Sequence, residues 1–468
     1  MRIVVHDYSG HPFQMQLSRA LAAQGHDVLH LFFESFQSPR GAVHLRPGDP
    51  RSLEIEGILF DEPFAKYSNF VKRRRQEIRY GKMAARRIAE YRPDLLLSAN
   101  APLDAQRIIQ RAAERLGSKF VFWLQDIYSL AITTILKQRG FPLASLVGAW
   151  YTHLERKMLA ASHAVVMISP DFAPVLKHWG VPLSRLYTIE NWAVREEIIP
   201  HAQDNPWSRE HGLAGRFVFL YSGTIGMKHN PALLVDLAAS MQSDPDVIVV
   251  VVSQGERAEW IRGEVQRRGI TNLRLLPLQP WERMSEVLSS ASVLTALLGE
   301  ESGAFSVPSK VLSYLCAGRP LLLSVPAPNL AARIVSGQTT GSGPISGRRL
   351  GLVAPPGDDA AFLAAARALH HDPARRQELA ANALAYAEST FDIIRIAAQF
   401  TQVFEAAGIP PAMARPSSPH PERLQPIGRL KPLAPLEHLE QMEQLERLAS
   451  SIGSVPNSVD TPSPFLRR

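Results

Sequence analysis

The chain has 468 residues, 46% of them hydrophobic, so it is long enough to bury more than one core. Its net charge of +7 at pH 7 indicates an anionic partner, namely a sugar nucleotide, lipid headgroups or nucleic acid. The single cysteine, Cys316, excludes an intramolecular disulfide and a multi-thiolate metal site, which favours a reducing compartment such as the cytoplasm. The first apolar run is too short for a signal peptide, and no stretch approaches the roughly 18 apolar residues of a spanning helix. We therefore expect a protein that does not span a membrane.

The first half of the chain alternates strand-like and helix-like segments. Residues 3–5 and 28–33 form apolar runs typical of buried strands, and between them Phe13, Leu17 and Leu21 follow helical spacing. The alternation continues with strands expected at 95–98, 120–124, 164–168 and 186–189, and with helices expected at 103–116 and 143–161. Such alternation predicts a parallel sheet covered by helices on both faces.

A second series of the same kind follows a polar stretch within residues 195–215, which we interpret as a linker. Strands are expected at 217–221, 247–252, 273–275, 293–297 and 321–324, and closing helices at 359–371, 373–389 and 393–406. The sequence therefore predicts two Rossmann-like domains, residues 1–198 and 199–406. In such sheets the binding crevice lies at the carboxyl ends of the strands, so function is expected in the strand-to-helix loops.

Residues 407–468 differ in composition from the rest of the chain. Six prolines fall between positions 410 and 426, and there is little apolar periodicity to bury, so we expect a mostly disordered tail. Within it, a run of large apolar residues recurs every three positions, which is compatible with a short amphipathic helix or a partner-binding segment; the run consists of Leu436, Leu439, Met442, Leu445 and Leu448.

Two loops of the second half combine backbone freedom with positive charge. The first, YSGTIGMKHN at 221–230, follows an expected strand and opens a helix. Gly223 and Gly226 free its backbone, and Lys228 adds a charge. Amide groups at a helix start together with a lysine suit a diphosphate, whereas the alternative is an ordinary turn with a solvated lysine. Position alone supports both interpretations equally.

The second loop, GAFSVPSKVLSYLCAGRP at 303–320, also precedes a helix. Pro308 suits a first helical turn, Ser306 or Ser309 can cap the exposed amides, and Lys310 projects from that turn. This arrangement again favours an anion-binding site. The alternative is a well-capped structural helix that ends at Gly318.

Three smaller signals add to these loops. Gly255 follows the strand at 247–252 and lets a base or phosphate approach the backbone, although a plain turn explains it equally well. Asp126 follows the strand at 120–124, so it is either an acid or base at the mouth of the crevice or a helix cap. His11, next to Gly10, reaches the same space, but a lone histidine is more often structural.

No metal site is expected. Asp244 and Asp246 flank a proline and are typical of a turn, and the pair His370-His371 lacks acidic or thiol companions at metal spacing. The sequence also lacks the GxxxxGK[ST], GxSxG and HExxH motifs.

The densest positive segment is KYSNFVKRRRQEIRYGKMAARR, residues 66–87. Helical spacing places Phe70, Met83 and Ile88 among its charges, which favours an interfacial helix on anionic lipid. A solvated helix face is the alternative. Nucleic acid is the weakest interpretation, because aromatic interleaving and a recognised binding module are missing, so no nucleic-acid partner is expected.

Five segments, taken in order, resemble the motifs of one known family. HDYSGHPFQMQLSRALAAQGHDV looks like its N-terminal glycine loop and helix, and VVMISPDF and YTIENW look like the segments before its linker. YSGTIGMKH looks like the start of its nucleotide-binding domain, and VPSKVLSYLCAGRP resembles the helix that holds the nucleotide sugar. The family is that of the retaining glycosyltransferases of the GT-B fold, family-4 type, of bacterial exopolysaccharide and O-antigen synthesis. The resemblance covers about residues 1–406.

This resemblance implies an α/β protein of the GT-B fold, which binds a nucleotide-diphosphate sugar mainly with the second domain and a lipid-linked or polysaccharide acceptor with the first. Lys228 would neutralise the leaving diphosphate, and Asp126 is the acid expected near the acceptor. No metal or other cofactor is implied. The remaining substrate-binding residues that it implies are Gly10, His11, Gly223, Thr224, Gly255, Gly303, Ser306, Val307, Ser309, Lys310 and Ser313.

The sequence departs from the family's pattern at two places. Many relatives carry two glutamates eight positions apart, and here those positions are Phe305 and Ser313, while Glu300 and Glu301 are out of register. Thr224 stands where some relatives have a phosphate-binding arginine. A serine still hydrogen-bonds a ribose hydroxyl, but less strongly than a carboxylate does.

The leading hypothesis is a cytoplasmic transferase, peripheral on the inner face of the plasma membrane, that moves a hexose or an N-acetylated or deoxy relative to its acceptor. The missing glutamates and the proline-rich tail support a second hypothesis, a catalytically silent homologue that organises polysaccharide assembly. A third, a sugar-nucleotide epimerase, rests on fold analogy alone.

Overall fold

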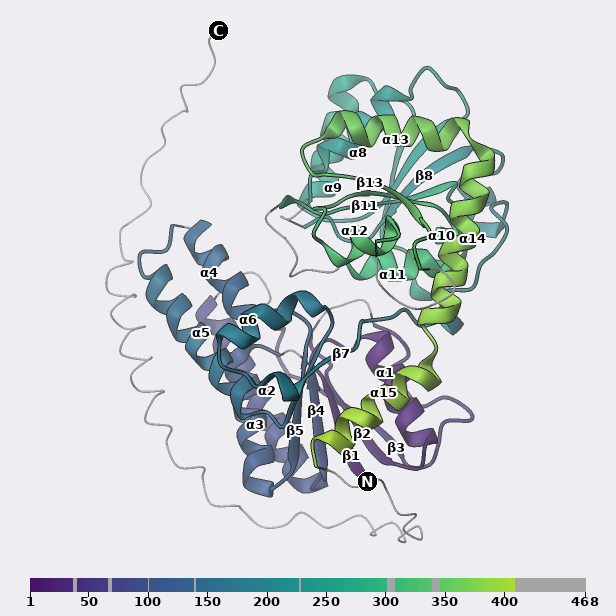
Figure 1. Cartoon of the computed structure of the whole chain (residues 1–468). Coiled ribbons are helices and arrows are strands. Elements are labelled where there is room, and N and C mark those ends of the chain that lie inside the picture. The colour runs from purple at the N-terminus through teal and green to yellow at the C-terminus, as the bar shows by residue number, and fades with distance from the viewer. Residues whose placement is uncertain are drawn as a thin grey trace. The chain divides into compact units, whose positions relative to one another are not determined.

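The computed structural model describes residues 1–36, 40–65, 70–99, 101–138, 140–226, 229–300, 308–338 and 346–408. These residues belong to one compact unit that contains two parallel sheets (Figure 1). Of the expected tail, all but Ala407 and Gly408 lies outside the described residues, so its disorder stays a prediction.

Seven parallel strands form the first sheet, in the order β3-β2-β1-β4-β5-β6-β7. They are β1 (Arg2–Asp7), β2 (Asp27–Phe33), β3 (Leu53–Ile58), β4 (Leu95–Ala99), β5 (Lys119–Leu124), β6 (Ala164–Met167) and β7 (Leu186–Thr188). The helices of this half are α1 (Pro12–Ala23), α2 (Phe70–Tyr91), α3 (Leu103–Leu116), α4 (Tyr128–Gln138), α5 (Ala144–Ala161) and α6 (Ala173–His178). The predicted alternation is confirmed. The sequence pattern did not predict the edge strand β3, because its sequence, LEIEGI, is half polar and only partly buried.

Six parallel strands form the second sheet, in the order β10-β9-β8-β11-β12-β13. They are β8 (Phe217–Ser222), β9 (Val247–Val252), β10 (Leu273–Leu276), β11 (Val293–Leu297), β12 (Leu321–Ser324) and β13 (Gly351–Ala354). The helices are α7 (Pro206–Glu210), α8 (Ala232–Ser240), α9 (Glu256–Arg268), α10 (Met284–Ser289), α11 (Ser309–Cys316), α12 (Leu330–Val335), α13 (Asp359–His371), α14 (Pro373–Thr390) and α15 (Ile393–Ala406). Sequence patterning did not predict β13, which begins with a glycine. A Cβ on Gly351 would lie 2.2 Å from the carbonyl oxygen of Leu321, so the glycine permits this strand pairing.

The strand order of each sheet reverses beside its first strand. In the first sheet β1 lies between β2 and β4, and in the second β8 lies between β9 and β11. Loops that leave two neighbouring strands in opposite directions open a crevice at the carboxyl edge, where ligands bind in sheets of this kind. The two glycine loops at Gly10 and Gly223 follow β1 and β8, so both stand at these switch points.

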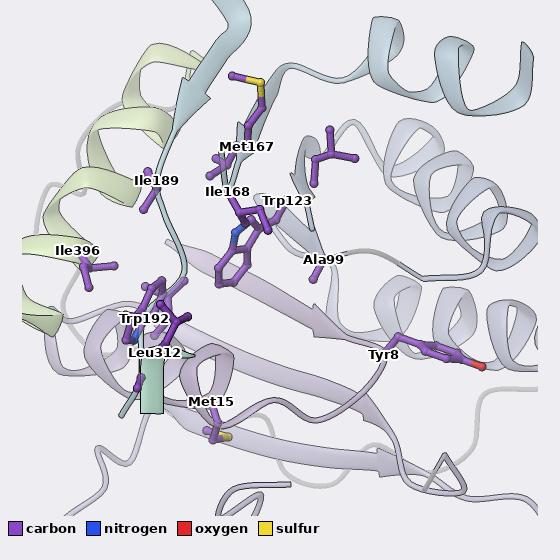
Figure 2. Close-up of a cluster of buried hydrophobic side chains, with 14 of the residues drawn as sticks. Tyr8, Met15, Ala99, Trp123, Met167, Ile168, Ile189, Trp192, Leu312 and Ile396 are labelled. Carbon is purple, nitrogen blue, oxygen red and sulfur yellow. The ribbon is translucent and has the colours of Figure 1, made fainter. Parts of the chain in front are cut away.

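The last helix, α15, packs against the first sheet's elements. It lies beside α1 (Figure 1), and Phe400 makes edge contacts with the rings of Trp123 and Trp192 at 4.8 and 6.3 Å between centroids. Ile396 belongs to the same buried cluster as these two tryptophans (Figure 2). The sequence assigned residues 393–406 to the closing helices of the second half. An amphipathic pattern identifies an apolar helix face but not the sheet that covers it.

The crossing of α2 and α3 depends on Gly81. A Cβ there would lie 2.8 Å from the Cα of Ala105, a backbone atom that cannot rotate away. Gly263, inside α9, has nothing within 4 Å of the equivalent position. The two glycines form a matched pair, because both stand within helices but differ in the space around them.

Gly81→Ala is expected to destabilise the protein by about 1–3 kcal/mol, the usual cost of overpacking, and so to lower Tm in thermal unfolding followed by circular dichroism. Gly263→Ala is expected to raise Tm, because alanine is favoured over glycine in a helix interior by about 0.5–1 kcal/mol. Equal Tm changes for the two variants would contradict this close packing of α2 on α3.

Candidate functional site

Helix α11 is hydrogen-bonded to the end of β8, at the switch point of the second sheet. The hydroxyl of Tyr314 donates to the carbonyl oxygen of Ser222 at 3.1 Å and accepts from the amide of the same residue at 2.9 Å. The next residue, Gly223, has φ 124°, a conformation that side chains rarely adopt. The two loops that the sequence singled out therefore meet, with the first turn of α11 beside the turn after β8.

Lys310 occupies this meeting point. Its Nζ donates to the hydroxyl of Tyr221 and lies 3.8 Å from the centroid of that ring. A Cβ added to Gly223 would lie 3.3 Å from Nζ, so the glycine also leaves room for the lysine head. Burial lowers the pKa of Lys310 from 10.5 to about 7. A lysine in this state gains charge when an anion binds beside it.

The backbone of the loop after β8 is held by its own side chains. The hydroxyl of Tyr221 donates to the carbonyl oxygen of Thr224 at 3.1 Å, and the amide of Gly226 donates to Nδ1 of His229 at 2.8 Å. The sequence pattern did not single out His229 or Tyr221. Lys228 lies outside the described residues, as do Gly303, Ser306 and Val307 of the second loop, so their predicted roles stay predictions.

Three other predicted residues have clear positions around this switch point. Ser313 is partly buried and follows Lys310 by three positions on α11, which places both on one helix face. Ser309 is exposed and does not cap the helix; Pro308 is the N-cap residue, with no side-chain cap, so the predicted capping by Ser309 is wrong. Gly255, with φ 97°, is the N-cap residue of α9, the helix that follows β9.

The glycine loop of the first sheet is organised by a buried carboxylate. Asp7, at the end of β1, accepts hydrogen bonds from the amides of Ser9 at 3.0 Å and His11 at 2.5 Å. Gly10 has φ 74°, and a Cβ there would lie 3.2 Å from Cδ of Arg40. The ring of His11 stacks on Phe13 at 5.5 Å. Because Asp7 occupies these amides, the loop offers close backbone approach and not an anion cradle.

Two buried histidines stand behind this loop. His6 is hydrogen-bonded to Ser98 and Tyr80, each at 2.8 Å, and His30 to Ser18 at 2.8 Å. Burial lowers both pKa values from 6.5 to about 3, so both rings are neutral near pH 7. They are structural groups: His6 joins β1 to β4 and α2, and His30 joins β2 to α1.

Asp126 lies between the end of β5 and the start of α4, at the carboxyl edge of the first sheet. A residue of another helix also binds amides at the start of α4. Glu155, on α5, accepts from the amides of Tyr128 and Ser129, each at 3.0 Å. Burial raises the pKa of Glu155 from 4.5 to about 7, and the nearby charge of Asp126 adds to that rise. The only sequence signal for Glu155 was a charged residue on the apolar side of a predicted helix.

A pocket joins the segments VVMISPDF and YTIENW to α11 and α12. Its volume is about 260 Å³ including its open mouth, and its lining residues are Ile168, Glu190, Asn191, Leu312, Leu330, Ile334 and Tyr386. Nη2 of Arg333, on α12, lies 2.7 Å from Oδ2 of Asp171 in the first of these segments. Burial raises the pKa of Glu190. The family-like segments of both halves therefore meet at one place.

Helix α2 divides its positive side chains between two faces. Arg73, Arg74 and Arg87 turn toward the protein, where their partners are Glu77, Asp104, and Glu54 with Glu56. Exposed side chains form a stripe along the other face, the basic stripe of Lys72, Arg75, Arg79, Lys82 and Arg86. Met83 is 37% exposed beside the stripe, and Phe70, the first residue of the helix, is 59% exposed. Ile88 is fully buried, so its predicted place among the surface charges is wrong.

Across the ranges that the structure describes, no three His, Cys, Asp or Glu side chains gather as metal ligands would. The helices within those ranges include none long and apolar enough to cross a membrane.

Comparisons with known proteins agree with this architecture. Residues 14–196 match the family model Glycosyltransferase Family 4, and residues 204–385 match Glycosyl transferases group 1. Among individual proteins, the chain is similar to WcaI of Escherichia coli strain K12, described as a colanic acid biosynthesis glycosyl transferase, with 23% identity over 248 residues. That match covers 52% of this chain and 60% of WcaI.

Solved structures share the fold along nearly their whole length. Sucrose-phosphate synthase from Thermosynechococcus elongatus superposes with a TM-score of 0.64 at 16% identity, over 86% of this chain and 98% of that one. HepE from Anabaena, in complex with UDP and glucose, gives a TM-score of 0.62 at 14% identity, over 87% and 100%. The predicted fold class is thus confirmed. The chain thus contains a glycosyltransferase family 4 domain at residues 14–196 and a glycosyl transferases group 1 domain at residues 204–385, on the GT-B fold.

Proposed function

We propose that the protein is a glycosyltransferase that moves a hexosyl group from a nucleotide-diphosphate donor to a lipid-linked or polysaccharide acceptor in cell-surface polysaccharide synthesis. The observation that carries the proposal is Lys310, whose head lies beside Gly223 at the switch point of the second sheet. The similarity to WcaI supports a polysaccharide or its lipid-linked precursor as the acceptor.

A diphosphate fits the surroundings of Lys310 for an electrostatic reason. The lysine lies against the ring and hydroxyl of Tyr221, and burial makes its charged form costly. A phosphate oxygen beside Nζ would offset that cost and restore the charge. The structural neighbour HepE, solved in complex with UDP and glucose, supports a sugar nucleotide as the donor. Lys228 and the amides near Gly303, Ser306 and Val307 would complete the diphosphate site, and Ser313 and Gly255 would contact the nucleoside.

The reaction breaks the bond between the sugar's anomeric carbon and the diphosphate oxygen, and it forms a bond from that carbon to an acceptor hydroxyl oxygen. The proton of that hydroxyl passes to the departing diphosphate oxygen. The leaving diphosphate becomes more negative, so fixed positive groups at Lys310 and Lys228 stabilise the transition state. Asp126, at the carboxyl edge of the first sheet, orients the acceptor hydroxyl. Gly10 and His11 shape the space in which the acceptor meets the donor sugar. Transfer proceeds with retention at the anomeric carbon and without a metal, and the anomeric coupling of the product in NMR tests the retention.

Lys310→Met keeps the apolar stem but removes the charge, and it is expected to weaken UDP binding about tenfold at pH 6, where Lys310 is protonated. A hydrogen bond to a charged group contributes about 1.5–3 kcal/mol, and 1.4 kcal/mol is a factor of ten. Because the pKa of Lys310 in the folded protein is lowered to about 7, Lys310 loses its charge as pH rises through 7. The difference in UDP affinity between wild type and Lys310→Met should therefore be smaller at pH 8.5. Isothermal titration calorimetry measures both affinities.

Lys177→Met is the matched control, since Lys177 is an exposed lysine on α6, and it should bind UDP like wild type. Equal UDP affinity of wild type and Lys310→Met at pH 6 would overturn the role of Lys310. Failure of the wild type to bind any sugar nucleotide would favour the silent scaffold. Conversion of a sugar nucleotide without acceptor would favour the epimerase.

We further propose that the protein is cytoplasmic and binds the inner face of the plasma membrane through α2. The basic stripe presents five positive side chains on one helix face, with Met83 exposed beside them and Phe70 exposed at the first residue of the helix. Glu62 and Glu90 offset part of this charge, at 3.2 Å from Lys72 and 3.1 Å from Arg86. Anionic lipid attracts such a stripe, and the exposed apolar side chains enter the headgroup region.

Arg75→Gln combined with Lys82→Gln is expected to weaken binding to phosphatidylserine vesicles about thirtyfold, because each basic residue near an anionic surface contributes about 1 kcal/mol. These two positions are chosen because neither forms an ion pair within the described ranges. Sedimentation with vesicles at low and high salt measures the effect, and wild-type binding should fall as salt rises.

The control for this experiment is Arg262→Gln combined with Arg267→Gln, which removes two exposed charges from α9 instead. That variant should sediment with vesicles as wild type does. Wild-type binding that is as strong on neutral phosphatidylcholine as on phosphatidylserine, or unchanged binding by the α2 variant, would rule out this membrane contact.

A further inference from the structure

Glu155 is a buried acid in the middle of α5, with none of its surface exposed. Its two carboxylate oxygens have separate partners: Oε1 accepts from the amide of Tyr128 and Oε2 from the amide of Ser129, each at 3.0 Å. These amides belong to the first turn of α4, where backbone N–H groups lack partners within the helix. A side chain from a neighbouring helix thus completes the start of α4.

The position of α4 controls the position of Asp126. Only residues 125–127 separate the end of β5 at Leu124 from the start of α4 at Tyr128. Leu124 is fully buried in the sheet, and Ile127 is 3% exposed, so the short connection is anchored on both sides. With β5 fixed by the sheet and α4 fixed by Glu155, Asp126 has little freedom to move.

The Ser129 side chain and the two amides favour the ionised form of Glu155. Asp126 and Tyr128 face it from the β5–α4 connection, and the like charge of Asp126 disfavours its ionised form. The charges of Arg73 and Glu77 of α2 act on the Tyr128 phenol, and these two side chains bind each other at 2.7 Å.

Helix α3 also packs on α5 and carries an acid near it. This is Asp104 of α3, which Arg74 and Tyr151 hold at 2.9 Å each. Asp104 is therefore engaged elsewhere. Only the ionised carboxylate accepts well from both amides, because in a protonated acid one of the two oxygens carries the proton and donates.

We propose that Glu155 is a positioning residue for sugar transfer: its carboxylate locks the segment that carries Asp126 into the geometry that the acceptor needs. This inference rests on the proposed function. It differs from a purely structural role because protonation of the carboxylate weakens its hold on the amides and frees the segment that carries Asp126. Burial raises the pKa of Glu155 to about 7, so the carboxylate is ionised and the lock closed above that pH.

Glu155→Gln tests the proposal, because glutamine has the shape of the protonated acid but does not titrate. We expect kcat to fall about tenfold to a hundredfold at pH 8, the range that a small misplacement of a reacting group produces. The KM for the donor should stay within twofold of wild type, since the donor is bound by the other sheet. The fall of wild-type kcat as pH drops through about 7 should be absent in the variant.

Two controls accompany this variant. Glu114→Gln removes an exposed glutamate from α3 and should leave kcat and its pH profile unchanged. Hydrogen–deuterium exchange measures the protection of residues 125–130 in the wild type, after correction for intrinsic rates. Because it needs no substitution, it remains decisive if Glu155→Gln does not fold. More exchange at pH 6 than at pH 8 is expected there.

The proposal would be overturned if Glu155→Gln kept the wild-type kcat at pH 8, or if the kcat of this variant still fell as pH drops through about 7. Equal corrected exchange at pH 6 and pH 8 would overturn it as well. Failure of the proposed function is a separate result, in which wild type binds no sugar nucleotide or transfers no sugar. The exchange experiment would then still show whether Glu155 locks the segment.

Discussion

The parallel direction of every strand is the constraint on which the functional geometry depends. In each sheet all carboxyl ends lie at one edge, and the order reverses beside β1 and β8. Loops from distant parts of the sequence must therefore meet at two places. Lys310 reaches Tyr221 and Gly223 because β11 lies next to β8, not because these residues are close in sequence. A parallel sheet needs continuous apolar strands, such as VIVVVV of β9, and this need leaves the polar chemistry to the loops.

Buried charges at these edges have three different kinds of support. Asp7 has the amides of its own loop, Glu155 has the amides of a neighbouring helix, and Lys310 has a tyrosine hydroxyl and ring. The two carboxylates are satisfied by the fold and therefore position backbone. Lys310 has the weakest support, since a neutral hydroxyl and a ring face replace an opposite charge. It is the group with most to gain from an anionic ligand.

Periodicity predicted the two sheets well, because runs such as residues 28–33 and 247–252 are unambiguous. It failed where the deciding contact is tertiary. The helix at 393–406 has an apolar face that fits either sheet, and only the aromatic contacts of Phe400 assign it to the first. Motif reasoning found Gly223 and Lys310 from local sequence. It had no way to find Glu155, whose role exists only because α5 packs on α4.

Lys310 and Glu155 impose opposite demands on pH. Burial brings both pKa values to about 7, yet Lys310 works when protonated and Glu155 when ionised. In the free enzyme, both groups are then in their working states together only near neutral pH. A bound diphosphate raises the pKa of Lys310, so the lysine stays protonated to higher pH. The loss of activity at low pH then depends on protonation of Glu155. Therefore kcat/KM, which reports the free enzyme, should fall on both sides of neutrality, whereas kcat should fall mainly on the acid side.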